Sequence, residues 1–270
     1  MLCGITGSSG VLGNRLTKFK NINFVNFKGN ITNKKQVYNW IKKNKFDIFI
    51  HLAAIVPVTE VNKNYNYAKK VNFLGTKYIL DALIKYQNMN LKWFFFPSPS
   101  HVYEFNKKKK IKENGKLNPI SKYGKTKLIA EKYINKKSKV IKFNYCIGRI
   151  FSFTDKKQKV PFLVPSLKKK ISLSKKKLIL DNLNHYRDFI SIKDLCRAII
   201  FLSKKKYQGT INLASGKKIL IENIASKINK NKKLIFNKNK KITYLIADTA
   251  KLKKLGFKNK YNSLEDIYYK

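Results

Sequence analysis

Two residues near the middle of the chain have the types and the spacing needed for acid–base chemistry. In the segment SKYGKTK, Tyr123 and Lys127 are four positions apart, so on a helix their side chains lie on one face. A free phenol has a pKa of about 10, which makes it a poor proton-transfer group at neutral pH. A nearby ammonium can lower that pKa and can also hold a ribose hydroxyl. The pair is therefore a candidate acid–base centre.

A glycine-rich segment near the amino end suits a dinucleotide. The segment TGSSGVLG follows a short apolar strand and opens a helix, with Gly7, Gly10 and Gly13 at intervals of three. Glycines there permit a tight turn and let backbone N–H groups approach a diphosphate, whose charge the helix start favours. This turn lies upstream of Tyr123 and Lys127. Because both motifs occur in one chain, a functional pair is a better interpretation of Tyr123 and Lys127 than a chance spacing.

Composition is that of a globular protein with an unusual charge. The 270 residues are 43% hydrophobic and 13% aromatic, and 60 Lys and Arg against 14 Asp and Glu give a net charge of +46. The lysines are spread over the whole chain, and no DNA- or RNA-binding motif accompanies them. We therefore expect no specific nucleic-acid partner, although the charge favours anionic ligands.

The cysteines and the apolar runs suggest a cytoplasmic location. Cys3, Cys146 and Cys196 are an odd number without metal-ligand spacing, so we expect buried reduced thiols and no metal site. No apolar run reaches the roughly 18 residues that cross a bilayer, and no signal peptide precedes the first motif.

Apolar periodicity alternates between strands and helices. Expected strands cover residues 1–5, 22–27, 46–54, 91–96, 139–145 and 209–215, and expected helices extend from the glycine turn to about 19 and over 34–44, 67–86 and 120–135. This order predicts an α/β fold of the Rossmann type, a doubly wound parallel sheet that binds ligands at the carboxyl ends of its strands. We expect an NAD(P)-binding domain over 1–145, returning near 185–215, and a smaller substrate-binding lobe mainly over 146–270.

The end of the second strand bears on the choice of cofactor. The acidic residue that usually grips the ribose of NAD has no counterpart in INFVNFKGN, and Lys28 stands near that place. A cation there could neutralise a 2′-phosphate, so NADP is mildly favoured over NAD.

Taken together, the motifs resemble those of the extended short-chain dehydrogenase/reductase family, the NAD(P)-dependent epimerases and dehydratases that act on nucleotide-linked sugars. The matching segments, in the family's order, are TGSSGVLG, GNIT, HLAA, VNFLGTKYILDA, SHVY, YGKTK, RDFISIKDLCRAI and GTINLASGK. They extend over nearly the whole chain. The resemblance implies a nucleotide-sugar substrate, NADP or NAD, and a role in making deoxysugars for surface polysaccharides. It does not select the sugar.

The resemblance also implies a role for individual positions. Tyr123 would be the general acid or base, and Lys127 its electrostatic partner. The expected cofactor contacts, besides these two and Lys28, are Gly7, Ser8, Ser9, Gly10, Val11, Leu12, Gly13, Asn30, Ile31, Leu52, Ala53 and Ala54. The expected substrate contacts are Ser100, His101, Tyr145, Arg187 and the loop 154–165. Related proteins often form dimers through helices such as 67–86 and 120–135, so a homodimer is one possible state, and the sequence leaves the oligomeric state open.

Arg187 has two interpretations. An arginine at this position of the family commonly contacts the diphosphate of the sugar nucleotide, for which a guanidinium has suitable bidentate geometry. The alternative is a salt bridge with Asp188 or Asp194.

The stretch PSPSHVY departs from the family at its catalytic hydroxyl. The family's Ser or Thr lies four residues before Tyr103, where this chain has Pro99. Loss of one such donor typically costs about 100- to 1000-fold in rate. Ser98 and Ser100 flank the position, and a bulge or bend imposed by the two prolines could bring one of them into the role, with Ser100 preferred.

The same stretch bears on the reaction. Dehydratases of the family place Asp and Glu after the catalytic Thr, whereas this chain has Ser100 and His101, which argues against dehydration. His101 could instead shuttle protons, as a Cys does there in bifunctional epimerase-reductases, or could be only a surface residue. We expect a 4-keto sugar-nucleotide reductase. The alternatives are a 4-epimerase and a catalytically impaired dinucleotide-binding member that acts as a sensor or assembly subunit.

Overall fold

The structure is a computed structural model, and it describes residues 1–105, 109–229, 231–238 and 241–268. The chain divides into two compact units. Unit 1 comprises residues 1–103, 117–150 and 196–211, and unit 2 comprises residues 104–116, 151–195 and 212–270.

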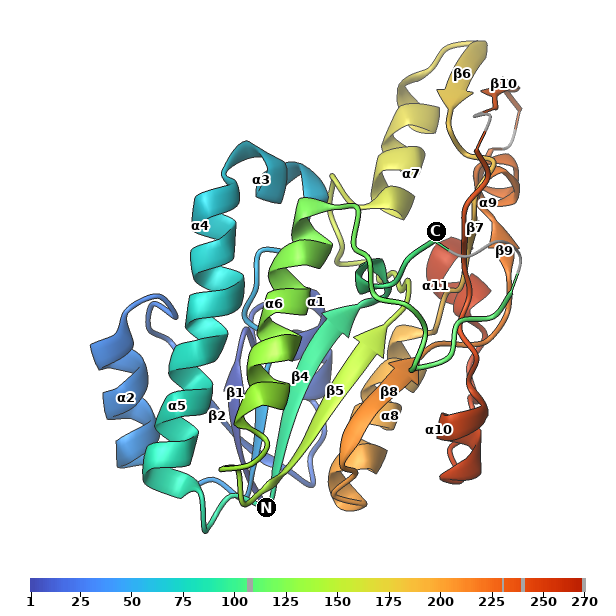
Figure 1. Cartoon of the computed structure of the whole chain (residues 1–270). Coiled ribbons are helices and arrows are strands. Elements are labelled where there is room, and N and C mark those ends of the chain that lie inside the picture. The colour runs from blue at the N-terminus through green and yellow to red at the C-terminus, as the bar shows by residue number, and fades with distance from the viewer. Residues whose placement is uncertain (106–108, 230, 239–240, 269–270) are drawn as a thin grey trace. The chain divides into compact units, whose positions relative to one another are not determined.

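A six-stranded sheet organises unit 1 (Figure 1). Its order is β2-β1-β3-β4-β5-β8, and the neighbouring pairs from β2 to β5 are parallel. The strands are β1 (Leu2–Thr6), β2 (Asn23–Asn26), β3 (Ile48–His51), β4 (Trp93–Pro99), β5 (Asn144–Ile150) and β8 (Gly209–Leu213), the last of which crosses into unit 2. This confirms the predicted doubly wound α/β fold. The chain leaves β1 toward β2 and later returns on the other side of β1 as β3, so the strand order reverses between β1 and β3. Ligands of such folds bind beside that reversal.

Helices connect the strands, and some of them have a polar side chain as their N-cap. They are α1 (Val11–Leu16), α2 (Lys34–Lys43), α3 (Val58–Lys63), α4 (Tyr65–Lys69), a π-helix η1 (Lys70–Gly75), α5 (Thr76–Gln87), a 3-10 turn η2 (Ser100–Val102), α6 (Lys122–Lys137) and α8 (Ile192–Lys204). The side chain of Asn33 caps α2, and that of Ser121 caps α6 by accepting from the N–H of Gly124. Figure 1 shows α6 in front of the strands and α1 behind them. Within the described ranges, no helix combines the length and the apolarity that a membrane span requires.

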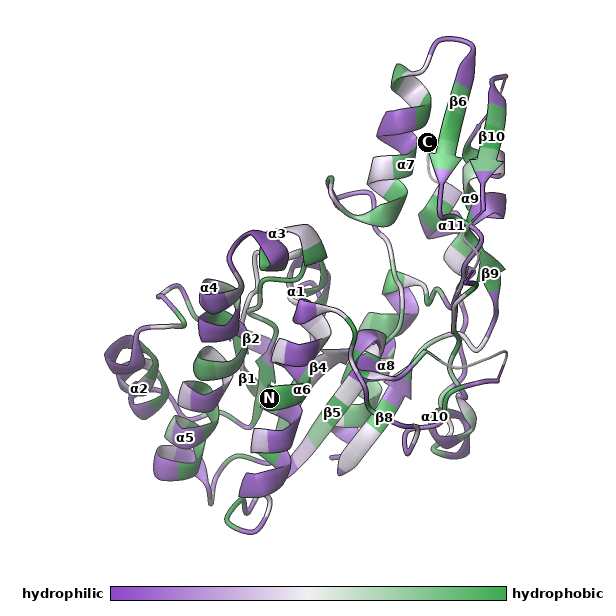
Figure 2. Ribbon diagram, turned by 45° about the horizontal axis from the view of Figure 1, so that its top comes forward, coloured by the Kyte–Doolittle hydropathy of each residue, from purple (hydrophilic) through white to green (hydrophobic). Residues whose placement is uncertain are grey.

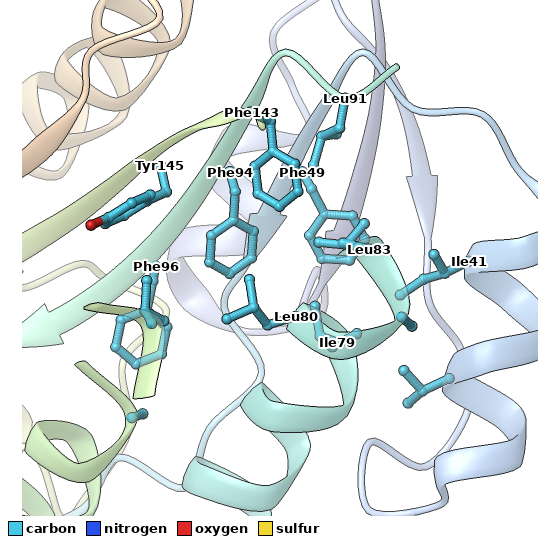
Figure 3. Packing of buried hydrophobic residues seen from close by; sticks show 14 of the residues in the cluster. Ile41, Phe49, Ile79, Leu80, Leu83, Leu91, Phe94, Phe96, Phe143 and Tyr145 are labelled. Carbon is cyan, nitrogen blue, oxygen red and sulfur yellow. The ribbon is translucent and has the colours of Figure 1, made fainter. Parts of the chain in front are cut away.

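One hydrophobic core cluster of unit 1 lies between the sheet and α2, α5 and α6. Ile41 of α2, Ile79 and Leu83 of α5, and Phe94 and Phe96 of β4 are among its buried members (Figure 3). The hydrophilic colour on the same helices marks their outward residues (Figure 2). Burial of apolar side chains at intervals of three and four along α5 fixes the face that it presents to the sheet.

Strand β4 passes through both prolines without a bulge. Its register with β5 continues residue by residue, with Pro97 opposite Gly148 and Pro99 opposite Ile150. The expected bulge or bend is therefore absent. Pairing with β3 stops at Phe95, so beyond that residue one edge of β4 has no ladder partner, and residues without an N–H are tolerated there.

Strand β5 also differs from the prediction. The sequence predicted a strand over 139–145, whereas β5 covers Asn144–Ile150. The preceding residues form a turn after α6, with the N–H of Val140 donating to the carbonyl of Lys137. Residues 139–142 alternate like a strand but are exposed or half-buried, and within 139–143 only Phe143 is buried.

Unit 2 has two small sheets. Strands β6 (Lys177–Asp181) and β10 (Lys233–Asn237) pair in parallel, and β7 (Tyr186–Arg187) lies between β11 (Tyr244–Leu245) and β9 (Ile219–Leu220). Its helices are α7 (Leu163–Leu173), α9 (Ile221–Ile228), α10 (Ala250–Lys254) and α11 (Ser263–Tyr268). Apolar side chains of α7, α9 and α11 form its core. Because α7 begins at Leu163, the expected substrate loop 154–165 is shorter than predicted and ends at Phe162.

Candidate active site

The turn after β1 is built tightly against the end of β3. Gly7 has a φ of +71°, and a Cβ there would lie 2.6 Å from the backbone nitrogen of Ala53. A Cβ on Gly13 would lie 2.3 Å from the carbonyl oxygen of Gly7. Neither position admits another residue without movement of the backbone. The turn and Leu52, Ala53 and Ala54 therefore form one surface at the carboxyl ends of two neighbouring strands.

Gly10 is different, because the fold itself does not require a glycine there. Its φ is −68°, it is exposed, and a Cβ would meet only the carbonyl oxygen of Gly7, at 3.3 Å. A Cβ there would require the Gly7 carbonyl to shift by only a few tenths of an ångström, and Gly10 is the N-cap of α1, between Ser9 and Val11. A diphosphate that approaches the backbone closely would account for this glycine. The geometry of the turn therefore fits a dinucleotide.

A buried chain of hydrogen bonds joins β1, β3 and α5. The Thr76 hydroxyl donates to the carbonyl of Asn72 (2.8 Å), so it accepts from His51 Nε2 (2.9 Å). His51 Nδ1 is then the acceptor, and the Thr6 hydroxyl donates to it (2.7 Å) while accepting from the N–H of Ala53 (3.2 Å). Burial, and secondarily the charge of Lys127, lowers the pKa of His51 to about 3. The ring is therefore neutral at pH 7, with its proton on Nε2.

Asn72 extends this network to α6. Its side-chain oxygen accepts from the N–H of Ile55 (2.8 Å), and its amide nitrogen donates to the Ile55 carbonyl (3.0 Å) and to the Thr126 hydroxyl (3.1 Å). Thr126 in turn donates to the carbonyl of Tyr123 (2.8 Å). The sequence analysis gave Asn72 no role. The available signal was a fully polar residue in the middle of an apolar helix pattern, and the π-helix at that point is typical of functional sites.

Tyr123 is held at the amino end of α6. It is 8% exposed, and its ring belongs to a small cluster with Val61 and Ala68. The ring of His101 lies edge-on to it, with the ring centres 6.5 Å apart. Burial raises the pKa of Tyr123 above its ordinary value, and no charge opposes that shift. The expectation that Lys127 lowers the pKa of this phenol is therefore wrong for the protein alone, because desolvation dominates.

Lys127 lies one turn further along the same face of α6. It is 2% exposed, and its ammonium lies 3.9 Å from the centre of the Phe96 ring. In the part of the chain that the structure describes, no hydrogen bond or ion pair engages it. Burial lowers the pKa of Lys127 to about 7, against the opposing effect of the Glu131 carboxylate. The pairing of Tyr123 and Lys127 on one buried face agrees with the prediction from their spacing.

The two serines beside Pro99 lie close to this face. Ser98 is buried on β4, and alternation places its side chain on the side of Phe96, which α6 covers. Its hydroxyl has no hydrogen-bond partner within the described residues, which is uncommon for a buried polar group. Ser100 begins η2 and is also buried. Across the described ranges, neither hydroxyl is hydrogen-bonded to Tyr123.

The expected contacts to the adenine side have local partners of their own. Lys28 is exposed after β2. Asn30 accepts from the N–H and the hydroxyl of Thr32 through its side-chain oxygen. Ile31 belongs to the hydrophobic core, where it packs against Gly75. A ligand there would meet Lys28 and the outer side of Asn30 before Ile31.

Tyr145 is not at this site. It is the second residue of β5, at the amino end, whereas the candidate residues gather at the carboxyl ends of the strands. Its ring is part of the core with Phe94 and Phe96, as Figure 3 shows. The prediction that Tyr145 contacts the substrate is therefore wrong, because β5 begins at Asn144 and not at residue 139.

Arg187 lies in unit 2, on β7. Its guanidinium donates to the carbonyl of Tyr186 (2.8 Å) and to the hydroxyl of Thr243 (3.0 Å). The alternative of a salt bridge to Asp188 or Asp194 is wrong. Asp188 accepts from the backbone of Ser215, Gly216 and Ala247, and Asp194 from the backbone of Lys260 and Tyr261. Burial lowers the pKa of Arg187 to about 10, so it is a charged, largely desolvated cation that no carboxylate in the described ranges neutralises.

The family model described as GDP-mannose 4,6 dehydratase matches residues 8–267, which is nearly the whole chain. The chain belongs to the extended short-chain dehydrogenase/reductase family of NAD(P)-dependent epimerases and dehydratases.

The relatives that the chain matches are named for different reactions. The chain is 29% identical over 187 residues to a GDP-6-deoxy-D-talose 4-dehydrogenase of Aggregatibacter actinomycetemcomitans, covering 69% of this chain and 62% of that protein. It is 29% identical over 221 residues to a dTDP-D-glucose 4,6-dehydratase of Dictyostelium discoideum, covering 77% and 50%. The chain thus matches about half to three fifths of the length of these relatives.

A solved structure supports the fold of this family member. The RMD protein of Pseudomonas aeruginosa, complexed with NADPH, superposes with a TM-score of 0.87, covering 99% of this chain and 97% of that one at 20% identity. At that identity the likeness shows the fold alone.

Proposed function

We propose that the chain is an NAD(P)-dependent reductase of a 4-keto sugar nucleotide. The observation that carries the proposal is the buried, protonated phenol of Tyr123 on the same face of α6 as Lys127, in the unit that also contains the glycine turn. A reductase needs a group that gives a proton to the carbonyl oxygen as the carbon is reduced. A phenol whose pKa burial raises above its ordinary value carries that proton at neutral pH.

The residues present fit a nicotinamide dinucleotide. The turn from Gly7 to Gly13 would hold the diphosphate, Leu52, Ala53 and Ala54 would line the ribose and nicotinamide, and Lys127 would hold a ribose hydroxyl. When bound, the nicotinamide supplies the hydride of the reduction. The exposed cation Lys28 favours the extra phosphate of NADPH over NADH.

The chain's own groups carry the proton side of the reaction. As hydride adds to C4, the C4–oxygen double bond becomes a single bond, and the Tyr123 hydroxyl gives its proton to that oxygen. The Lys127 ammonium stabilises the phenolate that remains, and solvent then reprotonates Tyr123. His101, whose ring lies edge-on to that of Tyr123, would pass that proton inward.

Substrate selection rests on anionic recognition. Arg187, with its uncompensated charge, would bind the diphosphate of the sugar nucleotide. Dehydratases of the family have two carboxylates at the positions that Ser100 and His101 occupy in this chain. Their absence disfavours elimination of water. The name of one relative, a GDP-6-deoxy-D-talose 4-dehydrogenase, describes chemistry at C4, as proposed here.

The test combines cofactor binding with a substrate panel. NADPH and NADH fluorescence is titrated first, and the protein is then incubated with GDP-, dTDP- and UDP-linked 4-keto sugars and the products are identified. Tyr123→Phe is expected to reduce turnover by at least about 100-fold while the cofactor dissociation constant stays within about twofold. Full turnover by Tyr123→Phe would refute the mechanism. The 4-epimerase alternative is tested with 4-hydroxy sugar nucleotides of the same nucleotides, whose conversion into their C4 epimers without net consumption of NAD(P)H would show the epimerase instead.

A second candidate rests on β4. Pro99 stands at the family's catalytic hydroxyl, and neither Ser98 nor Ser100 is hydrogen-bonded to Tyr123 in the described structure. The chain would then bind the dinucleotide as a sensor or assembly subunit without turnover. Tight NADPH binding with no product from any member of the panel would favour this candidate.

A further inference from the structure

Helix α6 carries a third ionisable residue on its buried face. Tyr123, Lys127 and Glu131 follow one another at intervals of four, and Glu131 is only 1% exposed. Residues at this spacing lie on one side of a helix. The candidate acid–base pair therefore continues directly into a buried carboxylate, to which the sequence analysis gave no role.

Apart from Glu131, the groups around Lys127 do little to stabilise its protonated, charged form. The aromatic face of Phe96 lies beneath the ammonium, and His51 on β3 is neutral. Tyr123, one turn back on α6, is protonated and also neutral. Among the charged groups around this face, the carboxylate of Glu131 is the one whose field favours the charged form of Lys127.

The guanidinium of Arg149, on β5, holds the carboxylate of Glu131 through two hydrogen bonds. Arg149 Nε donates to Glu131 Oε1 (3.1 Å), and one of its terminal nitrogens donates to Oε2 (2.7 Å). Both side chains are nearly inaccessible, and the guanidinium also lies 4.8 Å from the centre of the Tyr103 ring. A bidentate partner of this kind keeps a buried carboxylate ionised and holds its orientation. On β4, Ser98 is the register partner of Arg149 and lies beside this pair.

We propose that Glu131, held by Arg149, is a positioning residue that keeps the Lys127 ammonium charged beside Tyr123. The role of the Lys127 charge in stabilising the Tyr123 phenolate rests on the proposed function. The electrostatic coupling between Glu131 and Lys127 does not.

The test measures the titration of Lys127 directly, without cofactor or substrate. Protein labelled with ¹³C at lysine Cε is titrated by NMR from pH 5 to 10, where the ring current of Phe96 should separate the Lys127 signal from those of the exposed lysines. Loss of that signal in Lys127→Arg assigns it. In Glu131→Gln the midpoint is expected to fall by about one pH unit or more. In the control Glu60→Gln, which removes the exposed partner of Lys63, it should not move.

A second variant covers the case in which Glu131→Gln does not fold. The double variant Glu131→Leu/Arg149→Leu removes both charges, and replacement of a buried ion pair by apolar residues is often neutral for folding. The Lys127 midpoint should fall in this variant too. An unchanged midpoint in either folded variant would overturn the proposal.

The outcome is separable from that of the proposed function. If no sugar nucleotide is turned over but the midpoint falls, the reductase proposal fails and the coupling stands. If turnover is found and the midpoint does not move, the coupling fails and the reductase proposal stands.

Discussion

Replacement of Lys127 by methionine should stabilise the fold and remove the candidate activity. Methionine fills a similar volume without a charge. Burial lowers the pKa of Lys127 from 10.5 to about 7, so between these values the unfolded chain binds the proton more tightly than the folded chain. Each pH unit of that difference is worth about 1.4 kcal/mol. At pH 7 and below, the wild type therefore loses on the order of 4 to 5 kcal/mol to this residue.

The sign and the pH window make the prediction specific. In urea titrations at pH 7, 8, 9 and 10, Lys127→Met should be more stable than the wild type at pH 7, and its advantage should shrink by about 1.4 kcal/mol per unit toward pH 10.5. Lys63→Met, at an exposed lysine, should show no such trend and corrects for the general effect of the high net charge. A stability difference that is the same at pH 7 and pH 10 would refute the assignment of Lys127 as a destabilised, functional cation.

Two further predictions concern the glycine turn and unit 2. Gly13→Ala should lower the free energy of unfolding by about 1–3 kcal/mol, because its Cβ would lie 2.3 Å from a carbonyl oxygen. Gly10→Ala should change it by less than about 0.5 kcal/mol yet weaken NADPH binding at least about tenfold; equal effects of the two variants in urea and fluorescence titrations would contradict the distinction drawn between them. In unit 2, Asp188→Asn should cost about 2–4 kcal/mol, because an amide cannot accept all the bonds from Ser215, Gly216 and Ala247. Urea unfolding checks this, and a loss below about 0.5 kcal/mol would show that the carboxylate is not needed.

The parallel sheet could be predicted because its signals are local. Apolar runs bounded by turns predicted β1, β3 and the first part of β4, and glycines and caps marked where α1 and α6 begin. The start of β5 could not be predicted from alternation alone, because residues 139–143 have a strand-like pattern without burial on both faces. The course of β4 through Pro97 and Pro99 depends on where β3 ends, which is a property of the neighbour and not of the segment itself.

The candidate site was predictable in its residue types but not in its electrostatics. Spacing placed Tyr123 and Lys127 on one face, as the structure has them. The direction of the pKa shift of Tyr123 depended on how far the phenol is buried, and that requires α3 and α4, which pack on it from a distant part of the chain. Asn72 and Glu131 were missed for the same reason, since their partners Ile55, Thr126 and Arg149 are adjacent only after folding.

The residues of unit 1 that lower the stability of the fold lie in the same unit as the candidate site. Lys127 is a buried cation without a hydrogen-bonded or ion-pair partner in the described structure, and Ser98 has a buried hydroxyl without one. Gly10 lacks a side chain that the turn would accommodate with a shift of a few tenths of an ångström. Sequences optimised only for folding would remove such features, because each costs free energy or chain entropy. All three lie in unit 1, and Gly10 and Ser98 follow or end strands of the one sheet. Lys127 belongs to the candidate acid–base pair, and the other two residues end or follow strands of the same sheet, which is what a site under selection for chemistry should show. This grouping supports the proposal that this edge of the sheet acts on a ligand despite Pro99.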